Sequence, residues 1–256
     1  MDKSKLLFYD AYEDFYAMAG VSKAFGAYCK DAFGEDFSQD GFSNLEQIDM
    51  ILPYIPGGKD ISILDIGCGN GKALGYLQRK TGAYIYGFDY SEQAIRSARA
   101  LLTERSEFRE GIIGETDYPE EKFDVIISMD TMYFAQDMTA FVTQIKRWLK
   151  QEGIFFVGYQ EGDVLPKTSD AETTILAKAL KHNKMKYEVT DITRQTYDLL
   201  VTKRRAAVKH HAEFVAEGYG SWFDLIMGQT ECVTEPYAQF KEKMARYIYV
   251  ARKSGE

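Results

Sequence analysis

Apolar and polar residues along the middle of the chain follow two alternating periods. Short apolar runs rich in β-branched residues predict buried strands, and longer amphipathic stretches between them predict helices. The predicted strands cover 61–66, 83–88, 106–112, 123–128 and 153–159, and the predicted helices cover 70–80, 91–103 and 137–150. This alternation predicts a parallel sheet built from right-handed βαβ units.

Both flanks of this region are mainly helical in pattern. Helices are predicted at 1–20 and 44–52 before it, and after it come a helix near 170–182, a strand at 186–192, helices over 194–229 and a last strand at 246–251. We therefore expect one domain over 1–256. It would consist of an N-terminal helical cap (1–58), a core (59–193 and 245–256) and an inserted helical lid (194–244) over the sheet's carboxyl edge, where α/β sheets bind ligands.

Composition excludes several classes of protein. Acidic residues number 39 against 31 basic ones, and the net charge of −8 argues against general nucleic-acid binding, which needs a positive field. Three scattered cysteines and the absence of a His/Cys cluster predict a reduced, cytoplasmic protein without a metal site. The chain start lacks a signal-peptide pattern, and no stretch approaches the roughly 20 apolar residues of a membrane span.

The first predicted strand ends in a glycine-rich turn, Asp65-Ile66-Gly67-Cys68-Gly69-Asn70-Gly71. Glycines there permit positive φ and close approach of a ligand, and the next helix offers unpaired N–H groups. The second strand ends in Asp89, whose carboxylate can accept hydrogen bonds from two ribose hydroxyls. A nucleotide-like ligand is therefore expected at this turn.

The residues around the turn distinguish two such ligands. A dinucleotide turn needs a small residue where Lys72 stands, and Asp65 would repel a pyrophosphate. The same carboxylate, or a water that it orders, would attract an ammonium group. A ligand with an amino acid at one end and a ribose at the other, such as S-adenosylmethionine, fits both Asp65 and Asp89.

Four segments together resemble class I S-adenosylmethionine-dependent methyltransferases over roughly residues 60–160. They are Asp65–Gly71, Gly87–Ser91, Phe123–Asp130 and Leu149–Ile154. The resemblance implies an α/β, Rossmann-like sheet of seven mostly parallel strands in the order 3-2-1-4-5-7-6. It also implies S-adenosylmethionine as the cofactor.

The resemblance further implies roles for individual residues. The main chain near Gly67 would hold the methionine amino group, Asp89 the ribose and Tyr90 the adenine face. Ile112 and Ile113 stand where an acid and a backbone N–H usually meet adenine, so Asp117 or main chain would replace the missing acid. The cofactor-binding residues are then Asp65, Gly67, Cys68, Gly69, Asp89, Tyr90, Ile112, Ile113, Ser128, Met129 and Ser38.

The segment Phe33–Gly41 partly resembles a loop of phosphoethanolamine methyltransferases that closes over the cofactor carboxylate and the substrate. Gln39 and Asp40 stand at the places of its paired serines. Phe134 stands where those enzymes carry a catalytic histidine after the fourth strand. These departures argue against a phosphobase substrate.

The acceptor is less defined by sequence, because methyl transfer mainly needs proximity and alignment, with a base only when the nucleophile carries a proton. Candidate catalytic residues are Tyr133 and His210. Candidate substrate-binding residues are Tyr16, Phe37, Tyr133, Tyr159, Tyr197 and Trp222. The 18 tyrosines favour an amine or a small aromatic acceptor, because aromatic faces attract cations. The basic run 203–211 is either a solvated helix face or an anion clamp.

We expect methyl transfer to nitrogen or oxygen of a small molecule. Three alternatives remain open from the residues: an NAD-dependent oxidoreductase, a cofactor-binding protein without transferase activity, and an RNA or protein methyltransferase that uses the basic run. The sequence leaves the acceptor and the oligomeric state undetermined.

Overall fold

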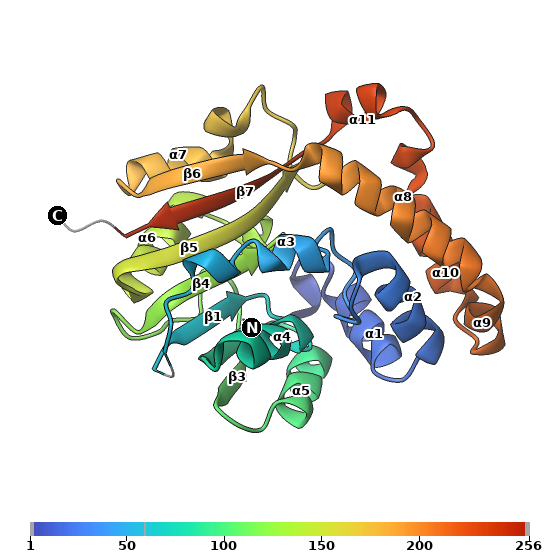
Figure 1. The fold of residues 1–256 in the computed structure, drawn as a ribbon, viewed down its shortest axis with the longest axis horizontal. Coiled ribbons are helices and arrows are strands. Elements are labelled where there is room, and N and C mark those ends of the chain that lie inside the picture. Colours follow the sequence, from blue (N-terminus) through green and yellow to red (C-terminus); the bar gives the residue numbers. More distant parts are fainter. Residues whose placement is uncertain (1–2, 59, 254–256) are drawn as a thin grey trace.

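The computed structural model describes residues 3–58 and 60–253 and contains a seven-stranded sheet in the order β3-β2-β1-β4-β5-β7-β6 (Figure 1). Strands β1 to β5 are parallel, and β7 lies antiparallel between β5 and β6. The predicted order and mostly parallel pairing are confirmed. The strands are β1 Ser62–Ile66, β2 Tyr84–Asp89, β3 Ser106–Glu110, β4 Phe123–Met129, β5 Leu149–Glu161, β6 Lys186–Asp191 and β7 Ala245–Arg252.

Helices cover both faces of this sheet, and successive strand residues point to opposite faces. Val125 packs on one face with α3, α4 and α5, whereas Ile126 packs on the other face with α6 and α7. Both faces are therefore apolar, which explains the nearly continuous apolar run of β4. These helices are α3 Leu45–Asp49, α4 Lys72–Thr81, α5 Glu92–Leu101, α6 Met138–Trp148 and α7 Ile175–His182.

The first two α-helices of the chain and the α-helices between β6 and β7 form one layer beyond the sheet's carboxyl edge (Figure 1). Phe15, Phe25 and Phe214 share its buried aromatic core, so the cap and the lid support each other. The helices are α1 Tyr9–Ala19, α2 Lys23–Phe33, α8 Thr193–Lys209, α9 His211–Ala216, α10 Gly220–Gln229 and α11 Tyr237–Lys243. Short 3-10 helices are Lys3–Lys5, Leu52–Tyr54, Met132–Phe134, Ala171–Thr173 and Glu231–Val233.

Boundaries of several elements differ from the prediction. Helix α6 ends at Trp148, because Leu149 already pairs with Phe123 and starts β5. Strand β3 ends at Glu110 instead of residue 112. The predicted helical region 194–229 is three helices, and Gly218, with φ +82°, lies in the break between the last two. None of the described helices is long and apolar enough to cross a membrane.

Candidate active site

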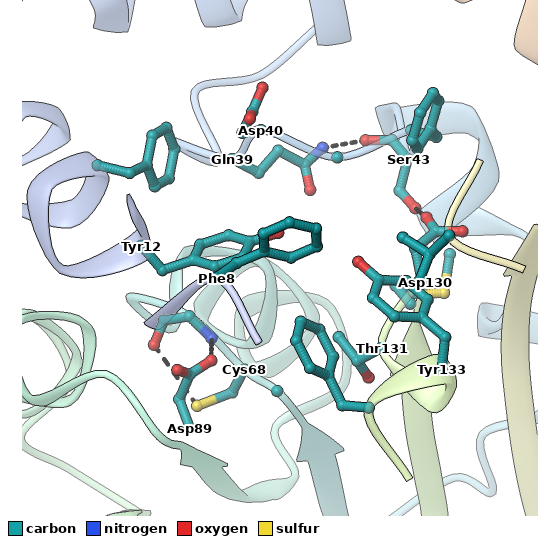
Figure 2. Close-up of a pocket in the computed structure, with 18 of the residues that line it drawn as sticks. Phe8, Tyr12, Gln39, Asp40, Ser43, Cys68, Asp89, Asp130, Thr131 and Tyr133 are labelled. Carbon is teal, nitrogen blue, oxygen red and sulfur yellow. Dashed lines mark hydrogen bonds between the residues drawn. The ribbon is translucent and has the colours of Figure 1, made fainter. Parts of the chain in front are cut away.

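A cavity of about 900 Å³ lies between the carboxyl edge of the sheet and the helical layer (Figure 2). We call the part beside the glycine turn and Asp89 the turn end, and the part beside Asp40, Gln160 and Gln229 the helix end. Figure 2 shows Asp89 and Asp40 on opposite sides of the cavity, with the rings of Phe8 and Tyr12 between them and Tyr133 to one side, next to Asp130. The cavity therefore offers two chemically distinct ends joined by aromatic walls.

The glycine turn has the geometry that its sequence predicts. Gly67 and Gly69 have φ of +72° and +52°, which disfavour any side chain. A Cβ on Gly67 would lie 2.6 Å from Cγ2 of Thr131, and one on Gly69 would lie 2.4 Å from the hydroxyl of Tyr16. The glycines thus also let Tyr16 and Thr131 close over the turn.

Asp89 fixes the turn end through its backbone contacts. Its Oδ2 accepts from the Gly69 N–H at 3.0 Å and its Oδ1 accepts from the Ser91 N–H at 2.9 Å. Burial raises the pKa of Asp89 to about 6, against the opposing effect of these hydrogen bonds. The carboxylate therefore joins the end of β2 to the turn after β1.

Asp65 is a second buried carboxyl group at the turn end, 8% exposed. Burial, followed by the nearby charge of Asp89, raises the pKa of Asp65 to about 8. Two buried carboxyl groups with raised pKa values would both be stabilised in their charged form by a cation placed beside them. The turn end is therefore suited to a positively charged group.

An aromatic wall and the loop after β3 flank the turn end. The Tyr90 ring packs edge-on against Tyr9, and its hydroxyl donates to the Leu7 carbonyl at 3.0 Å. Ile112 and Ile113 line the cavity, but the Ile112 N–H already donates to Oγ1 of Thr116 at 2.8 Å.

Asp117 was the candidate replacement for the missing adenine acid, and this suggestion is wrong. Its carboxylate accepts from Nε1 of Trp148 at 2.8 Å and pairs with Arg147. It does not contribute to the cavity lining. The hydrogen bonds from Arg147 and Trp148 hold the pKa of Asp117 well below its usual range, so it is a structural anion.

Most of the other predicted cofactor residues reach the cavity. Cys68, Met129 and Ser38 line it, whereas Ser128 lies behind it. The Ser128 hydroxyl bonds to Oγ1 of Thr131 at 2.7 Å, and Thr131 in turn donates to the Ile66 carbonyl at 2.7 Å. Ser128 therefore positions Thr131, which the sequence did not single out. Burial raises the pKa of the Cys68 thiol, which keeps it protonated.

Four of the predicted acceptor residues line the cavity, namely Tyr16, Phe37, Tyr133 and Trp222. Tyr16 belongs to the turn end, because its hydroxyl lies over Gly69. Burial, followed by the charge of Asp130, raises the pKa of Tyr133, so its hydroxyl stays protonated near neutral pH.

Three residues predicted for the acceptor side do not line the cavity and are not part of the candidate site. Tyr159 is buried with α6 and α7 on one sheet face, and the Tyr197 hydroxyl donates to the Glu235 carbonyl at 3.0 Å. His210 Nε2 pairs with Asp31 at 2.7 Å, which occupies the ring at the α2 interface. The basic run 203–211 is not a single solvated face, because Lys203 is 2% exposed.

Residues that the sequence did not single out complete the helix end. Asp130, directly after β4, forms a buried ion pair with Arg246 of β7, with Oδ1···Nε 2.9 Å and Oδ2···Nη2 2.6 Å. Arg246 also donates to the Phe42 carbonyl at 2.7 Å and to Oγ of Ser43 at 2.8 Å. This pair therefore ties the sheet to the loop that carries Asp40.

Two buried amides also lie at the helix end, and only Gln229 was not singled out from the sequence. Gln160 follows the end of the apolar run of β5 and donates to Oδ2 of Asp163 at 3.2 Å. Gln229, at the end of α10, donates to Oδ2 of Asp40 at 2.8 Å. Position at a strand's carboxyl end makes Gln160 an acceptor-side candidate from sequence. Asp40 lies in the segment Phe33–Gly41 that resembles a substrate-closing loop, whereas no local pattern indicates Gln229. Within the described residues, no cluster of His, Cys, Asp and Glu is arranged to hold a metal ion.

Residues 58–204, more than half of the chain, match the family model described as "Methyltransferase domain". The chain belongs to this family. The turn end lies inside the matched segment, whereas the cap and most of the helical insertion lie outside it. The methyltransferase family predicted from the four sequence segments is thereby confirmed.

Individual relatives are similar over part of their length. Phosphoethanolamine N-methyltransferase 1 of Arabidopsis thaliana is 33% identical over 145 residues, covering 55% of this chain and 28% of that protein. A ubiquinone biosynthesis O-methyltransferase of Neisseria meningitidis is 31% identical over 124 residues, which cover 45% of this chain and 52% of that protein. The chain thus spans only 28% and 52% of the length of these two curated relatives.

Solved structures share the fold over the whole chain. Haemonchus contortus phosphoethanolamine N-methyltransferase 2, solved with phosphomonomethylethanolamine and S-adenosylhomocysteine, superimposes with a TM-score of 0.79 at 16% identity. The match covers 99% of this chain and 61% of that one. A structure from Galdieria sulphuraria described as a "putative sarcosine dimethylglycine methyltransferase" gives a TM-score of 0.70 at 15% identity, and the match covers 98% of this chain and 100% of that one.

Proposed function

We propose that this protein is an S-adenosylmethionine-dependent methyltransferase that methylates nitrogen or oxygen of a small molecule. The observation that carries the proposal is the pair of buried carboxyl groups, Asp65 and Asp89, on either side of the glycine turn, which lines a cavity beneath the helical layer. Membership of the methyltransferase family supports the same conclusion.

The residues of the turn end have complementary roles in this proposal. Asp65 would attract the amino group of the cofactor, and Asp89 would accept hydrogen bonds from its ribose. Tyr90 would contact the adenine face. When bound, S-adenosylmethionine would supply an electrophilic methyl group on a sulfonium. The walls formed by Phe8, Tyr12 and Tyr133 would then exclude water and align the acceptor with that methyl group.

The size and enclosure of the cavity support a small acceptor. The helical layer covers the carboxyl edge of the sheet, and α1 and α10 both contribute residues to the wall. The basic run that an RNA acceptor would need is partly buried or already paired, since Lys203 is buried and Lys209 bonds to Asp31 at 2.6 Å. These contacts argue against a large anionic acceptor.

Isothermal titration with S-adenosylhomocysteine, S-adenosylmethionine and NADH tests the cofactor. We expect both sulfur ligands to bind with 1:1 stoichiometry, and Asp89→Asn to weaken both. Binding of NADH alone would overturn the proposal in favour of an oxidoreductase. Binding of the sulfur ligands without methyl transfer to any small-molecule acceptor would favour a cofactor-binding protein.

A further inference from the structure

The helix end of the cavity carries hydrogen-bond acceptors without matching donors. Oε1 of Gln160 and Oε1 of Gln229 are buried and have no hydrogen-bond partner within the described residues, and Gln160 as a whole is 3% exposed. Both residues line the cavity. Buried polar atoms are nearly always paired in folded proteins, so these two oxygens indicate a ligand or water that donates to them.

The orientation of the two amides follows from their neighbours. An ionised carboxylate only accepts hydrogen bonds, so the amide nitrogen of Gln229 must face Asp40 and that of Gln160 must face Asp163. Each amide oxygen is then turned away from its carboxylate. The side chains therefore present two carbonyl oxygens in addition to the two carboxylates.

Charge at this end of the cavity is negative. The charged residues among the described cavity lining are Asp40, Asp65, Asp89, Asp130, Asp163 and Lys5. Arg246 neutralises Asp130 through two short contacts. Asp40 has no comparable partner, because Nζ of Lys203 lies 4.0 Å from its Oδ1 and donates instead to the Gly41 carbonyl at 3.3 Å.

The aromatic residues of the helix end lie within the same negative field. Burial, followed by the charge of Asp130, raises the pKa of Tyr133, and Asp163 and Asp40 add to this effect. The pKa of Tyr12 is also raised, first by burial, then by Tyr133 and then by the charge of Asp40. Asp40 therefore lies near both tyrosine rings and Asp163 near the ring of Tyr133, and such rings attract cations.

We propose that the acceptor is a primary or secondary amine without a phosphate group, which enters as an ammonium ion between Asp40 and the amide oxygens of Gln160 and Gln229. This inference rests on the proposed methyltransferase function and names its substrate class. A phosphate or carboxylate on the acceptor would be repelled by Asp40 and Asp163. Among the described residues, no cation of the cavity lining lies at this end to compensate, so the proposal excludes anionic acceptors.

The transfer step balances with Asp40 as the proton acceptor. Asp40 takes one N–H proton from the ammonium, and the nitrogen lone pair bonds to the methyl carbon. The carbon–sulfur bond breaks with its electron pair left on sulfur. The products are an N-methylammonium ion and S-adenosylhomocysteine, and Asp40 returns its proton to solvent when they leave.

The experiment separates this inference from the proposed function. Titration with S-adenosylhomocysteine comes first, and its failure would overturn the proposed function itself. With that ligand bound, thermal shift and methyl transfer are measured for amines and hydroxyl analogues of the same shape. The pairs are tyramine and tyrosol, phenethylamine and phenethyl alcohol, putrescine and 1,4-butanediol, and ethanolamine and ethylene glycol, with phosphoethanolamine as an anionic probe.

We expect methylation of at least one amine of the panel and of neither phosphoethanolamine nor the hydroxyl analogues. Asp40→Asn should lower kcat/KM for that amine by about 10- to 100-fold, because hydrogen bonds to charged groups are strong when buried, and should leave affinity for S-adenosylhomocysteine unchanged. Gln229→Met provides a second variant, with a smaller loss expected. Asp31→Asn, outside the cavity, is the control.

Three outcomes would overturn the inference. They are cofactor binding without methylation of any amine of the panel, methylation of a hydroxyl analogue in preference to its amine, and an Asp40→Asn variant with unchanged kcat/KM for the amine. Because cofactor affinity is measured on each variant, misfolding of Asp40→Asn would be detected separately, and Gln229→Met would then decide the question.

Discussion

The two ends of the cavity are built in different ways. The turn end comes from short contiguous segments, and backbone hydrogen bonds from Gly69 and Ser91 fix Asp89. The helix end takes single residues from separated elements, with Asp40 before α3, Gln160 in β5 and Gln229 in α10. The geometry of the turn end therefore depends on neighbouring residues in sequence, whereas the geometry of the helix end depends on how separate elements pack. Under the proposed function, the turn end would bind the cofactor and the helix end would set the specificity for the acceptor.

The largest effect is expected at the ion pair that anchors the helix end. Arg246→Met should lower the free energy of unfolding by about 3–5 kcal/mol, because Asp130 would remain buried without a partner. Chemical denaturation measures this change. If the two ends are independent, the folded variant should still bind S-adenosylhomocysteine.

Two further variants test the cause of that loss. Arg194→Met removes a partner of an exposed pair with Asp198 and should leave stability unchanged. Asp130→Ala combined with Arg246→Met should recover part of the stability, because no unpaired charge remains. Equal stability of Arg246→Met and Arg194→Met would contradict the proposed role of the buried pair.

A smaller effect is expected from removing the carboxylate of the turn end. Asp89→Ala should weaken binding of S-adenosylhomocysteine by about 100-fold, because a charged acceptor and the support of the Gly69 N–H are both lost. Titration calorimetry measures this loss. Asp40→Asn is the matched variant at the other end, and a similar loss there would refute the division between the two ends.

The same division explains how much the sequence could predict. The glycine turn and Asp89 were predictable because they depend on residues close in sequence, and the strand order was predictable through the resemblance to a known family. Tyr12 belongs to a series of tyrosines at helical spacing with Tyr9 and Tyr16. Helical spacing alone does not distinguish residues of a core face from residues of a cavity wall. The assignment of Tyr12 needed the packing of α1 against the sheet.

The helix end could not be predicted for a physical reason. Asp40 and Gln229 meet only because α2 packs on α8 and α10 follows, which are long-range contacts without local pattern. The sequence around Arg246 is that of an ordinary strand, and nothing in it indicates the ion pair with the distant Asp130. Asp117 was close in sequence to the adenine loop, yet Trp148 and Arg147 hold it on the outer side.

The pH dependence of cofactor binding tests the turn end further. The pKa of Asp65 is about 8 in the free protein, mainly through burial, so this carboxyl group is mostly protonated at pH 7. A bound ammonium favours its ionised form, and binding then releases a proton. Affinity for S-adenosylhomocysteine should therefore rise about tenfold between pH 6.5 and pH 8. Asp65→Asn should bind more weakly and remove this rise.

The same group has the opposite effect on stability. A carboxyl pKa that is higher in the folded state than in the unfolded state means that the folded state holds the proton more tightly. Stability of the cofactor-free protein should therefore fall as pH rises from about 4 to about 8. Asp65→Asn should reduce this fall in thermal melts, and an unchanged pH profile would indicate that Asp65 is not protonated in the fold.

The smallest effects are expected from two single hydroxyl groups, one at each end. Tyr133→Phe should lower kcat/KM for the acceptor by about 2- to 10-fold and leave cofactor affinity unchanged, since one neutral hydrogen bond is lost. Tyr16→Phe should instead weaken binding of S-adenosylhomocysteine and leave kcat/KM for the acceptor nearly unchanged, because the Tyr16 hydroxyl lies over Gly69 at the turn end. Steady-state kinetics with titration of S-adenosylhomocysteine measures both quantities on both variants. If each variant changed cofactor affinity and kcat/KM equally, the two ends would act as one site, which would refute their separate roles.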